Sequence, residues 1–344
     1  MHKTERILRT DLLEHPAVRF WEKISPVRAD PDQLEVIKRK KEGSVYRLTG
    51  IGLGRSAVIA KRLRQDKAAI ERIVYEKVLP NLPITSLHYY GVVEEQNGLF
   101  SWLFLEDIGN QRYSPQDKDQ RRLVARWLAI MHTAAQELDV QAYLPDRGPD
   151  HYQIYLRSIR ETIPQIQPIS SFCPEACALL KSIVSMCNIL ETRWDQVEMF
   201  CSRIPRTLVH GDCLAKNIHV RKSKVGPTVV PFDWGGAGWG LPATDLGQSG
   251  LPYHSVPQTY PDLATYLSFT KDRGSNLDLV TIQQLANLGK MFWCLKVISR
   301  GVLQFDQKWA TFEDLLNDFS IYAAVLAETI RSANWDRRFM GPSR

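Results

Sequence analysis

The chain is organised around the stretch Leu208-Val209-His210-Gly211-Asp212-Cys213-Leu214-Ala215-Lys216-Asn217-Ile218. A short apolar run leads into a glycine-containing loop that carries one carboxylate, Asp212, and five residues later one amide, Asn217. A second carboxylate, Asp233, follows the apolar run at 229–232. We therefore expect a strand, a polar loop and a hairpin that ends in an acid. Phosphoryl transfer to a hydroxyl requires a carboxylate for the acceptor proton and an amide plus a carboxylate for magnesium, so this stretch suggests a kinase-type phosphotransferase.

The length and composition of the chain indicate a globular protein with more than one core. Its 344 residues exceed a single ordinary core, and 44% hydrophobic and 24% charged residues are typical of globular proteins in water. No apolar run reaches about 18 residues, so we expect no transmembrane helix. The charged start, residues 1–6, lacks the apolar region of a signal peptide. These features predict a cytoplasmic protein without a membrane partner.

Charge and cysteine content indicate which partners and metal sites can be expected. Residues 1–109 hold 18 basic and 15 acidic residues and residues 110–344 hold 26 and 23, so that each part has a net charge of +3. Nucleic-acid binding usually requires a concentrated basic face, and the one dense run, at 38–41, is typical of a solvated turn, so we expect no nucleic-acid partner. The six cysteines form no C-x-x-C pair, which argues against a zinc site and favours a reducing compartment.

The first third of the chain predicts a small α+β lobe. A short helix is expected within 10–24, followed by strands at 34–38, 45–51 and 57–61. The glycine-rich segment 50–54 resembles a phosphate loop, but only seven residues separate Gly54 from Lys61, which favours a turn between the second and third strands. A loop over a triphosphate is then expected at 39–44, with Ser44 among the nucleotide-binding residues, although this loop holds a single glycine.

Lys61 ends a β-branched run, Ala57-Val58-Ile59-Ala60-Lys61, of the kind that holds an ammonium against nucleotide phosphates. An ordinary edge-strand lysine is the alternative interpretation. Helical spacing over 66–79 supports the interpretation of Lys61 as a phosphate-binding lysine, because this spacing places a glutamate beside the apolar face. At about 100° per residue Glu71 flanks that face and Glu76 points nearly opposite. We expect Glu71 to orient Lys61 and Glu76 to be a solvated surface acid.

Two further strands are expected at 86–94 and 99–105, joined by the turn Gln96-Asn97-Gly98. The second leads into Leu105, Glu106 and Asp107, where the chain passes to helices. We expect the backbone amide and carbonyl groups of these three residues to be free to bind an adenine edge. Residues 1–109 would thus form a five-stranded nucleotide-binding lobe that includes a hinge at 105–109.

Residues 110–344 predict a larger, mostly helical lobe with the substrate site. A helix is expected from an N-cap at Ser114, with Pro115 at its first position, to about 138, with further helices near 151–163, 174–203, 260–272, 278–303 and 312–334. Short strands are expected at 207–209, 218–221 and 229–232. His132 adjoins an apolar face and suits a hydrogen-bonded core position better than catalysis. His210 likewise suits support of its own loop.

In chain order these features form one constellation: Lys61, Glu71, a linker, then Asp212, Asn217 and Asp233. The interval from Asp212 to Asn217 equals that from the aspartate to the asparagine in the H-R-D-x-x-x-x-N loop of protein kinases. Few hard oxygen ligands suit a magnesium ion that is shared with phosphates. We therefore expect Asp212 to accept the proton and Asn217 and Asp233 to hold Mg²⁺.

The sequence resembles the aminoglycoside phosphotransferase and choline kinase-like family of small-molecule kinases. The resemblance rests on His210-Gly211-Asp212 with Asn217, on Phe232-Asp233-Trp234, and on Gly240-Leu241-Pro242-Ala243-Thr244-Asp245-Leu246; it extends over about 34–250. It implies a two-lobed, protein-kinase-like α+β fold and transfer of the γ-phosphoryl group of ATP to a small-molecule hydroxyl. It further implies that Asp212 is the catalytic base, that Lys61 binds phosphate, and that Asp245 braces the loop from behind.

Several alternatives stay open. The phosphate loop is basic rather than glycine-rich, so GTP competes with ATP as the donor. Polycationic aminoglycosides favour an acidic substrate lobe, whereas residues 110–344 sum to +3, so a neutral or zwitterionic metabolite or another antibiotic class is an equal candidate for the acceptor. A catalytically inactive nucleotide-binding module is the alternative function. A protein kinase is disfavoured, since neither D-F-G nor A-P-E is present. A monomer and a homodimer are both compatible with the sequence.

Overall fold

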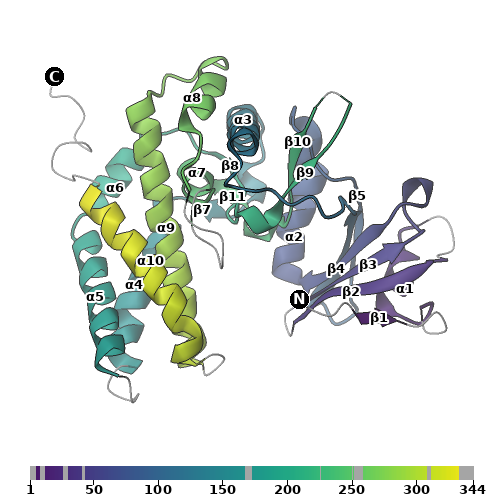
Figure 1. Cartoon of the computed structure of the whole chain (residues 1–344), viewed down its shortest axis with the longest axis horizontal. Helices are drawn as coiled ribbons and strands as arrows, with labels where there is room; N and C mark the ends of the chain where they lie inside the picture. Colours follow the sequence, from purple (N-terminus) through teal and green to yellow (C-terminus); the bar gives the residue numbers. More distant parts are fainter. Residues whose placement is uncertain are drawn as a thin grey trace. The chain divides into compact units, whose positions relative to one another are not determined.

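A computed structural model (Figure 1) describes residues 5–7, 12–25, 30–40, 43–166, 173–224, 226–249, 251, 259–307 and 311–332. It divides into two compact units. Unit 1 comprises Met1–Tyr113, Ala142–Leu144 and Lys216–Ala237, and unit 2 comprises Ser114–Gln141, Pro145–Ala215 and Gly238–Arg344. The α+β class with an N-terminal antiparallel sheet and a helical C-terminal region is confirmed. A nucleotide lobe ending at residue 109 and a substrate lobe thereafter remain a prediction.

Unit 1 is built on an antiparallel sheet with the strand order β1-β2-β3-β4-β6-β5. The strands are β1 (Glu5–Ile7), β2 (Gln33–Lys40), β3 (Gly43–Thr49), β4 (Val58–Arg64), β5 (Tyr89–Glu94) and β6 (Phe100–Glu106). Five of them were expected. The additional strand, β1, pairs with the edge strand β2, and its three residues are too few to be identified from an alternating pattern.

Alternation along β4 assigns its side chains to opposite faces of the sheet. Val58 and Ala60 are fully buried in an apolar cluster with α1 (Pro16–Trp21), in which Trp21, Leu48 and Phe104 also take part. Lys61 therefore points to the opposite face. Helix α2 (Gln65–Ile73) follows β4 directly and contacts β4, β5 and β6. The chain continues as a π-helical turn, Val74–Val78, and as a 3₁₀ turn, Leu79–Asn81.

A second, smaller element of unit 1 is the hairpin β9 (Ile218–Arg221) and β10 (Thr228–Pro231). Ile218 pairs with Pro231, and the N–H of Phe232 donates to the carbonyl of Asn217. The register therefore places Asn217, just before β9, and Asp233, just after β10, at the same end of the hairpin. The segment that joins β3 and β4 contains a 3₁₀ turn, Leu53–Arg55, as expected for a connection between strands.

Unit 2 is helical (Figure 1). Its helices are α3 (Lys118–Ala135), α4 (Pro149–Ile166), α5 (Pro174–Glu191), α6 (Trp194–Cys201), α7 (Ala243–Gln248), α8 (Leu263–Lys271), α9 (Leu279–Asp306) and α10 (Phe312–Ser332). A small sheet has the order β7 (Asp146–Arg147), β11 (Gly238–Gly240) and β8 (Thr207–Val209). None of the helices in the described ranges combines the length and the apolar character needed to cross a bilayer.

Three of the expected helices have different boundaries in the structure. Asp117, not Ser114, caps α3, because its carboxylate accepts hydrogen bonds from the N–H groups of Asp119 and Gln120. The single helix expected over 174–203 is two helices, α5 and α6, which are separated at Thr192 and Arg193. The helix expected within 10–24 is confined to α1, whose first residue is Pro16.

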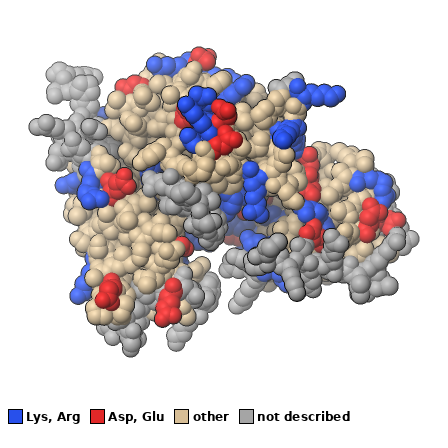
Figure 2. Space-filling view, in the orientation of Figure 1, with Lys and Arg blue, Asp and Glu red and all other residues tan. Residues whose placement is uncertain are grey.

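Helices α7 and α9 approach each other closely at two glycines. A Cβ atom added to Gly289 would lie 1.7 Å from the carbonyl oxygen of Ala243, and one added to Gly247 would lie 2.2 Å from the carbonyl carbon of Gly289. The backbones of the two helices are thus in direct contact, which only glycine permits. On the face shown in Figure 2, basic and acidic side chains are interspersed, in agreement with the even spread of charge along the sequence.

Candidate active site

Lys61 is the centre of a charged cluster in unit 1. Its Nζ donates to Oε1 of Glu71 at 2.5 Å and to Oδ1 of Asp233 at 2.7 Å. Burial by itself lowers the pKa of Lys61, but the carboxylates of Asp233 and Glu71 outweigh that effect and hold the pKa above its ordinary value. The ammonium is therefore charged and fixed between two carboxylates. The expected pairing of Lys61 with Glu71 is present.

Glu71 occupies the buried face of α2, and Glu76 lies at the surface. Glu71 is fully buried, whereas Glu76 accepts hydrogen bonds from Arg72 and from the hydroxyl of Tyr89 at exposed positions. The assignment of the two glutamates from helical geometry is thus confirmed. Burial raises the pKa of Glu71 to about 7, against the opposing effect of the Lys61 ammonium. Its second oxygen, Oε2, has no hydrogen-bond partner among the described residues.

Asp233 and Asn217 offer oxygen ligands at one end of the β9–β10 hairpin. Asp233 is partly exposed, and its backbone has φ = 69°, an uncommon conformation for a residue with a side chain. The 3₁₀ turn Trp234–Gly236 follows it immediately. The side chain of Asn217 is buried, with 4% exposure. The hairpin register and this sharp turn place the two residues at one end of the hairpin, through pairing between segments that are close in the sequence.

The donor set at this end of the hairpin fits magnesium. An amide oxygen and a carboxylate oxygen are hard ligands of the kind that Mg²⁺ prefers, and this ion usually completes its coordination with water and phosphate oxygens. The described residues contain no group of three or more His, Cys, Asp and Glu side chains that could enclose a metal by themselves. An ion held by Asn217 and Asp233 would therefore depend on a bound phosphate for further ligands.

The linker at Leu105, Glu106 and Asp107 differs from the expectation in one respect. The N–H of Glu106 donates to the carbonyl of His88, and the N–H of Asp107 donates to that of Ala57. These two N–H groups are therefore not free for an adenine edge, because the sheet continues through them. Their carboxylates are also bound inside unit 1, Glu106 to Arg221 and Asp107 to Arg47. Leu105 is buried in β6 between β4 and β5.

The expected phosphate loop lies in part outside the described residues, namely at Lys41 and Glu42. Ser44, assigned to nucleotide binding, belongs to β3 and pairs with Arg39 on one side and with Arg62 on the other. Its side chain is 9% exposed. Ser44 is thus a strand residue rather than part of the turn, and its role toward a nucleotide remains a prediction.

In unit 2 the loop after β8 is held by Asp245 of α7. The Asp245 carboxylate accepts from the N–H of His210 at 2.8 Å and from the N–H of Gly211 at 3.0 Å. Gly211 has φ = 71°, which favours glycine at this position. His132 approaches the same carboxylate with its Nε2 at 3.2 Å. Asp245 thus braces the loop, as the family resemblance implies.

The two histidines of this region have structural roles, as expected. His132 is buried and lies between Asp245 and the hydroxyl of Tyr266, which is 3.0 Å from its Nδ1. His210 is fully buried, and its Nδ1 accepts a hydrogen bond from the N–H of Asp212 at 3.3 Å. This bond requires an unprotonated Nδ1, so His210 supports the loop from within. Asp212 itself is half-buried.

Three side chains of this region were not identified from the sequence. Lys296 of α9 donates to the carbonyl of Gly211 at 2.8 Å, and Gln248 of α7 accepts from the N–H of Cys213 at 2.6 Å. Tyr266 of α8 supports His132. A lysine within the apolar sequence of α9 was the one available signal for Lys296. Cys213 is fully buried, and burial raises the pKa of its thiol well above the ordinary value, so it has no nucleophilic role.

Comparisons with known proteins assign the chain to a family. Residues 41–274 match the phosphotransferase enzyme family. The GDP and kanamycin complex of the aminoglycoside phosphotransferase APH(2")-IIIa has 14% identity and a TM-score of 0.63, covering 91% of this chain and 98% of that one. Choline kinase from Cryptosporidium parvum has 11% identity and a TM-score of 0.59, covering 92% and 96%. Spectinomycin phosphotransferase with ADP and spectinomycin has 13% identity and a TM-score of 0.55, covering 88% and 94%. A search of curated proteins returned no match.

Proposed function

Because the chain belongs to the phosphotransferase enzyme family, we propose that it transfers the γ-phosphoryl group of ATP or GTP to a hydroxyl of a small molecule. The observation that carries this proposal is the Lys61 ammonium fixed between Glu71 and Asp233. A lysine that is oriented by a helical glutamate is the usual phosphate ligand of kinase folds. Its position on a central strand, β4, keeps the ammonium preorganised, so that little reorganisation is needed when a phosphate binds.

Asn217 and Asp233 are the proposed ligands of magnesium. When bound, the ion neutralises phosphate charge and orients the transferred group. The Asp233 carboxylate accepts from Lys61, so this proposed metal ligand also lies beside the ammonium. Lys61 would retain Glu71 as its partner when Asp233 binds the ion. The buried glutamate therefore keeps the lysine in place.

Asp212 is the proposed base. In this role its carboxylate accepts the proton of the acceptor hydroxyl, and the loop must hold it in one orientation while the phosphoryl group moves. Bonds from Asp245, Gln248 and Lys296 fix the backbone on either side of Asp212. His210 is not available for this role, because its ring is buried and its Nδ1 is bonded to the loop.

Charge and the solved relatives support a proposal for the acceptor class. Solved relatives are complexes with kanamycin or with spectinomycin, and others are a choline kinase and an ethanolamine kinase. A strongly cationic acceptor requires a concentration of acidic side chains, whereas residues 110–344 carry a net charge of +3. A neutral or zwitterionic amino alcohol, sugar or antibiotic fits this balance better than a polycationic aminoglycoside.

The test is a coupled ADP- and GDP-release screen over amino alcohols, sugars, nucleosides and antibiotics in the presence of Mg²⁺. We expect at least one acceptor to raise nucleotide diphosphate release above the basal rate. Asp212→Asn should abolish that increase with an unchanged melting temperature, whereas Asp272→Asn, at an exposed position, should leave it intact. Full activity in Asp212→Asn would remove this residue as the base. Nucleotide binding without turnover on any acceptor would indicate an inactive module instead.

A further inference from the structure

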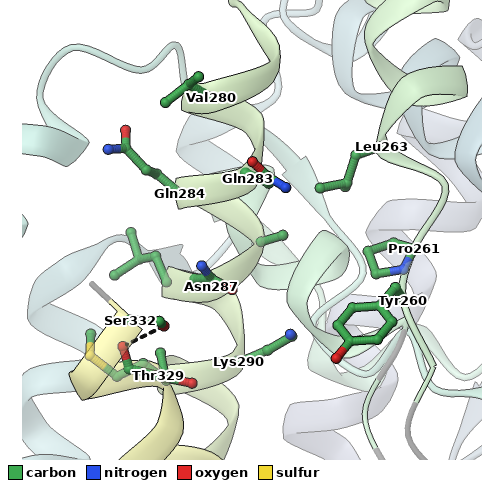
Figure 3. Close-up of a pocket in the computed structure, with 13 residues that line it drawn as sticks. Tyr260, Pro261, Leu263, Val280, Gln283, Gln284, Asn287, Lys290, Thr329 and Ser332 are labelled. Carbon is green, nitrogen blue, oxygen red and sulfur yellow. Dashed lines mark hydrogen bonds between the residues drawn. The ribbon is translucent and has the colours of Figure 1, made fainter. Parts of the chain in front are cut away.

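Unit 2 contains a cavity that the proposed phosphotransfer does not use. It has a volume of about 460 Å³ and lies among the segment before α8, the N-terminal half of α9 and the C-terminal end of α10 (Figure 3). This volume falls within the usual range of small-molecule sites, which is roughly 300–1,000 Å³. Apolar side chains of Leu263, Val280 and Met291 line part of it. The cavity is thus large enough for a ligand of several carbon atoms.

Four polar side chains of α9 line the same cavity, and three of them, Gln283, Asn287 and Lys290, follow one another along the helix. Their spacing of four and three residues places them on one stripe of the helix. Gln283 is exposed, Asn287 is half-buried and Lys290 is buried, so that the stripe leads from the surface to the interior. No described residue bonds to the amides of Gln283 and Asn287. The stripe therefore offers the amide donors of Gln283 and Asn287 next to the positive charge of Lys290.

Lys290 carries the only charge among the described residues that line the cavity. It is 8% exposed and extends from α9 toward Tyr260, with its Nζ 5.2 Å from the centre of the Tyr260 ring (Figure 3). No described carboxylate forms a salt bridge with it. Burial lowers the pKa of Lys290, with the charge of Glu328 as the opposing influence. A buried ammonium without a bonded anion is costly, and an anionic ligand would relieve that cost.

From this arrangement we propose that the cavity binds a small organic carboxylate. The carboxylate would pair with Lys290 and accept hydrogen bonds from Asn287 and Gln283, and its apolar part would lie against Leu263, Val280 and Met291. The single positive charge of Lys290 balances a monoanion, and the negative charge of Glu328 disfavours a ligand of higher charge such as a phosphate dianion. The proposal rests on residues of α8, of the segment before it, of α9 and of α10, and does not depend on the proposed phosphotransfer.

The test compares matched ligands by isothermal titration against the full chain. Hexanoate and 3-phenylpropanoate are paired with hexanamide and 3-phenylpropanamide, which keep the shape and lack the charge. We expect each carboxylate to bind at least about tenfold tighter than its amide, since hydrogen bonds to charged groups are stronger than those between neutral groups. Lys290→Met should remove this preference, Asn287→Leu should weaken carboxylate binding severalfold, and Lys271→Met, at an exposed position of α8, should leave it unchanged.

Melting temperatures of all three variants show whether each one is folded. If Lys290→Met does not fold, the ligand pairs on the wild-type chain and Asn287→Leu decide the question. Three results would overturn the proposal: no saturable binding of either carboxylate to the wild-type chain, equal affinity for carboxylates and amides, and undiminished binding to folded Lys290→Met. Inorganic phosphate that binds as tightly as the carboxylates would overturn the assignment to a monoanion.

Discussion

Glu71 of unit 1 and Asp245 of unit 2 are both fully buried carboxylates, but their pKa values move in opposite directions. Glu71 has one oxygen bonded to Lys61 and the other without a partner in the described part of the chain, and burial raises its pKa. Burial raises the pKa of Asp245, but the hydrogen bond and electrostatic attraction of His132, followed by those of His210, outweigh burial and lower it; both carboxylate oxygens accept bonds from loop N–H groups. Bonded donors, rather than depth, decide whether a buried acid stays ionised.

The comparison separates two roles for a buried acid. Lys61 is bonded to both Glu71 and Asp233, and under the proposed function the Asp233 contact would change when phosphate and metal bind. Asp245 has three fixed donors and holds the loop that carries Asp212. We therefore expect substitutions in the first cluster to affect activity more than stability, and substitutions in the second to affect both.

The largest effect is expected for Lys61→Met. Removal of the ammonium should lower kcat/KM by about 10²–10³-fold, because a preorganised charge at the transferred phosphate is lost. Stability should change less than in Asp245→Ala, since the raised pKa of Glu71 allows this carboxyl to become protonated when its partner is removed. Steady-state kinetics measures kcat/KM, and urea unfolding measures the change in stability. Lys222→Met, at an exposed position after β9, is the control and should match the wild type.

The next effect is the stability loss in Asp245→Ala. The substitution leaves the N–H groups of His210 and Gly211 buried without an acceptor, and each such group costs about 1–3 kcal/mol. We expect the free energy of unfolding to fall by about 3 kcal/mol and activity to fall with it. Urea unfolding at pH 7 measures the change. A variant as stable as the wild type would show that other side chains hold the loop.

A smaller effect is expected on the free energy of unfolding at low pH. Because the pKa of Asp245 is lowered in the folded chain, its contribution to stability is present above its ordinary pKa of 3.8 and is lost as the pH falls through the folded value. Unfolding free energies of the wild type should therefore decline below about pH 4. Asp245→Asn should show a shallower decline over the same range. Parallel curves for the two proteins would contradict the assignment.

The smallest effect is expected for the stability of Glu71→Gln. An amide keeps an acceptor for Lys61 and removes a charge that burial disfavours, so the free energy of unfolding at pH 7 should change by less than about 1 kcal/mol. The raised pKa of Glu71 favours the folded state below pH 4.5, and this contribution is lost as the pH rises toward about 7. The variant should lack that part of the pH dependence. A loss of stability as large as in Asp245→Ala would contradict the proposed difference between Glu71 and Asp245.

Local patterns in the sequence predicted most of the first unit. Alternation located β2, β3, β4, β5 and β6, and helical spacing separated Glu71 from Glu76, because both signals depend on neighbours in the chain. The hairpin of Asn217 and Asp233 was predictable for the same reason, since its register is set by residues close in sequence. These parts of the site depend on short-range geometry.

Contacts between distant segments were not predictable in the same way. The bonds from Lys296 and Gln248 to the loop join residues 85 and 35 positions away, and no local motif marks them. The prediction for the linker at 105–107 was wrong because it ended the strand too early. Its N–H groups were expected to be free, but strand pairing extends to Glu106 and Asp107, and the end of a strand is poorly determined by its own residues. The short strands β1, β7 and β11 escaped detection because two or three residues show no period.

The contact between Gly247 and Gly289 has a consequence for engineering. Helix α7 carries Asp245 and Gln248, helix α9 carries Lys296, and all three side chains hold the same loop. Because the two backbones touch at these glycines, a larger residue at either one would separate the helices and displace all three supports together. Mutant libraries intended to broaden the range of acceptors should therefore keep both glycines fixed and vary residues that leave this helix pair intact.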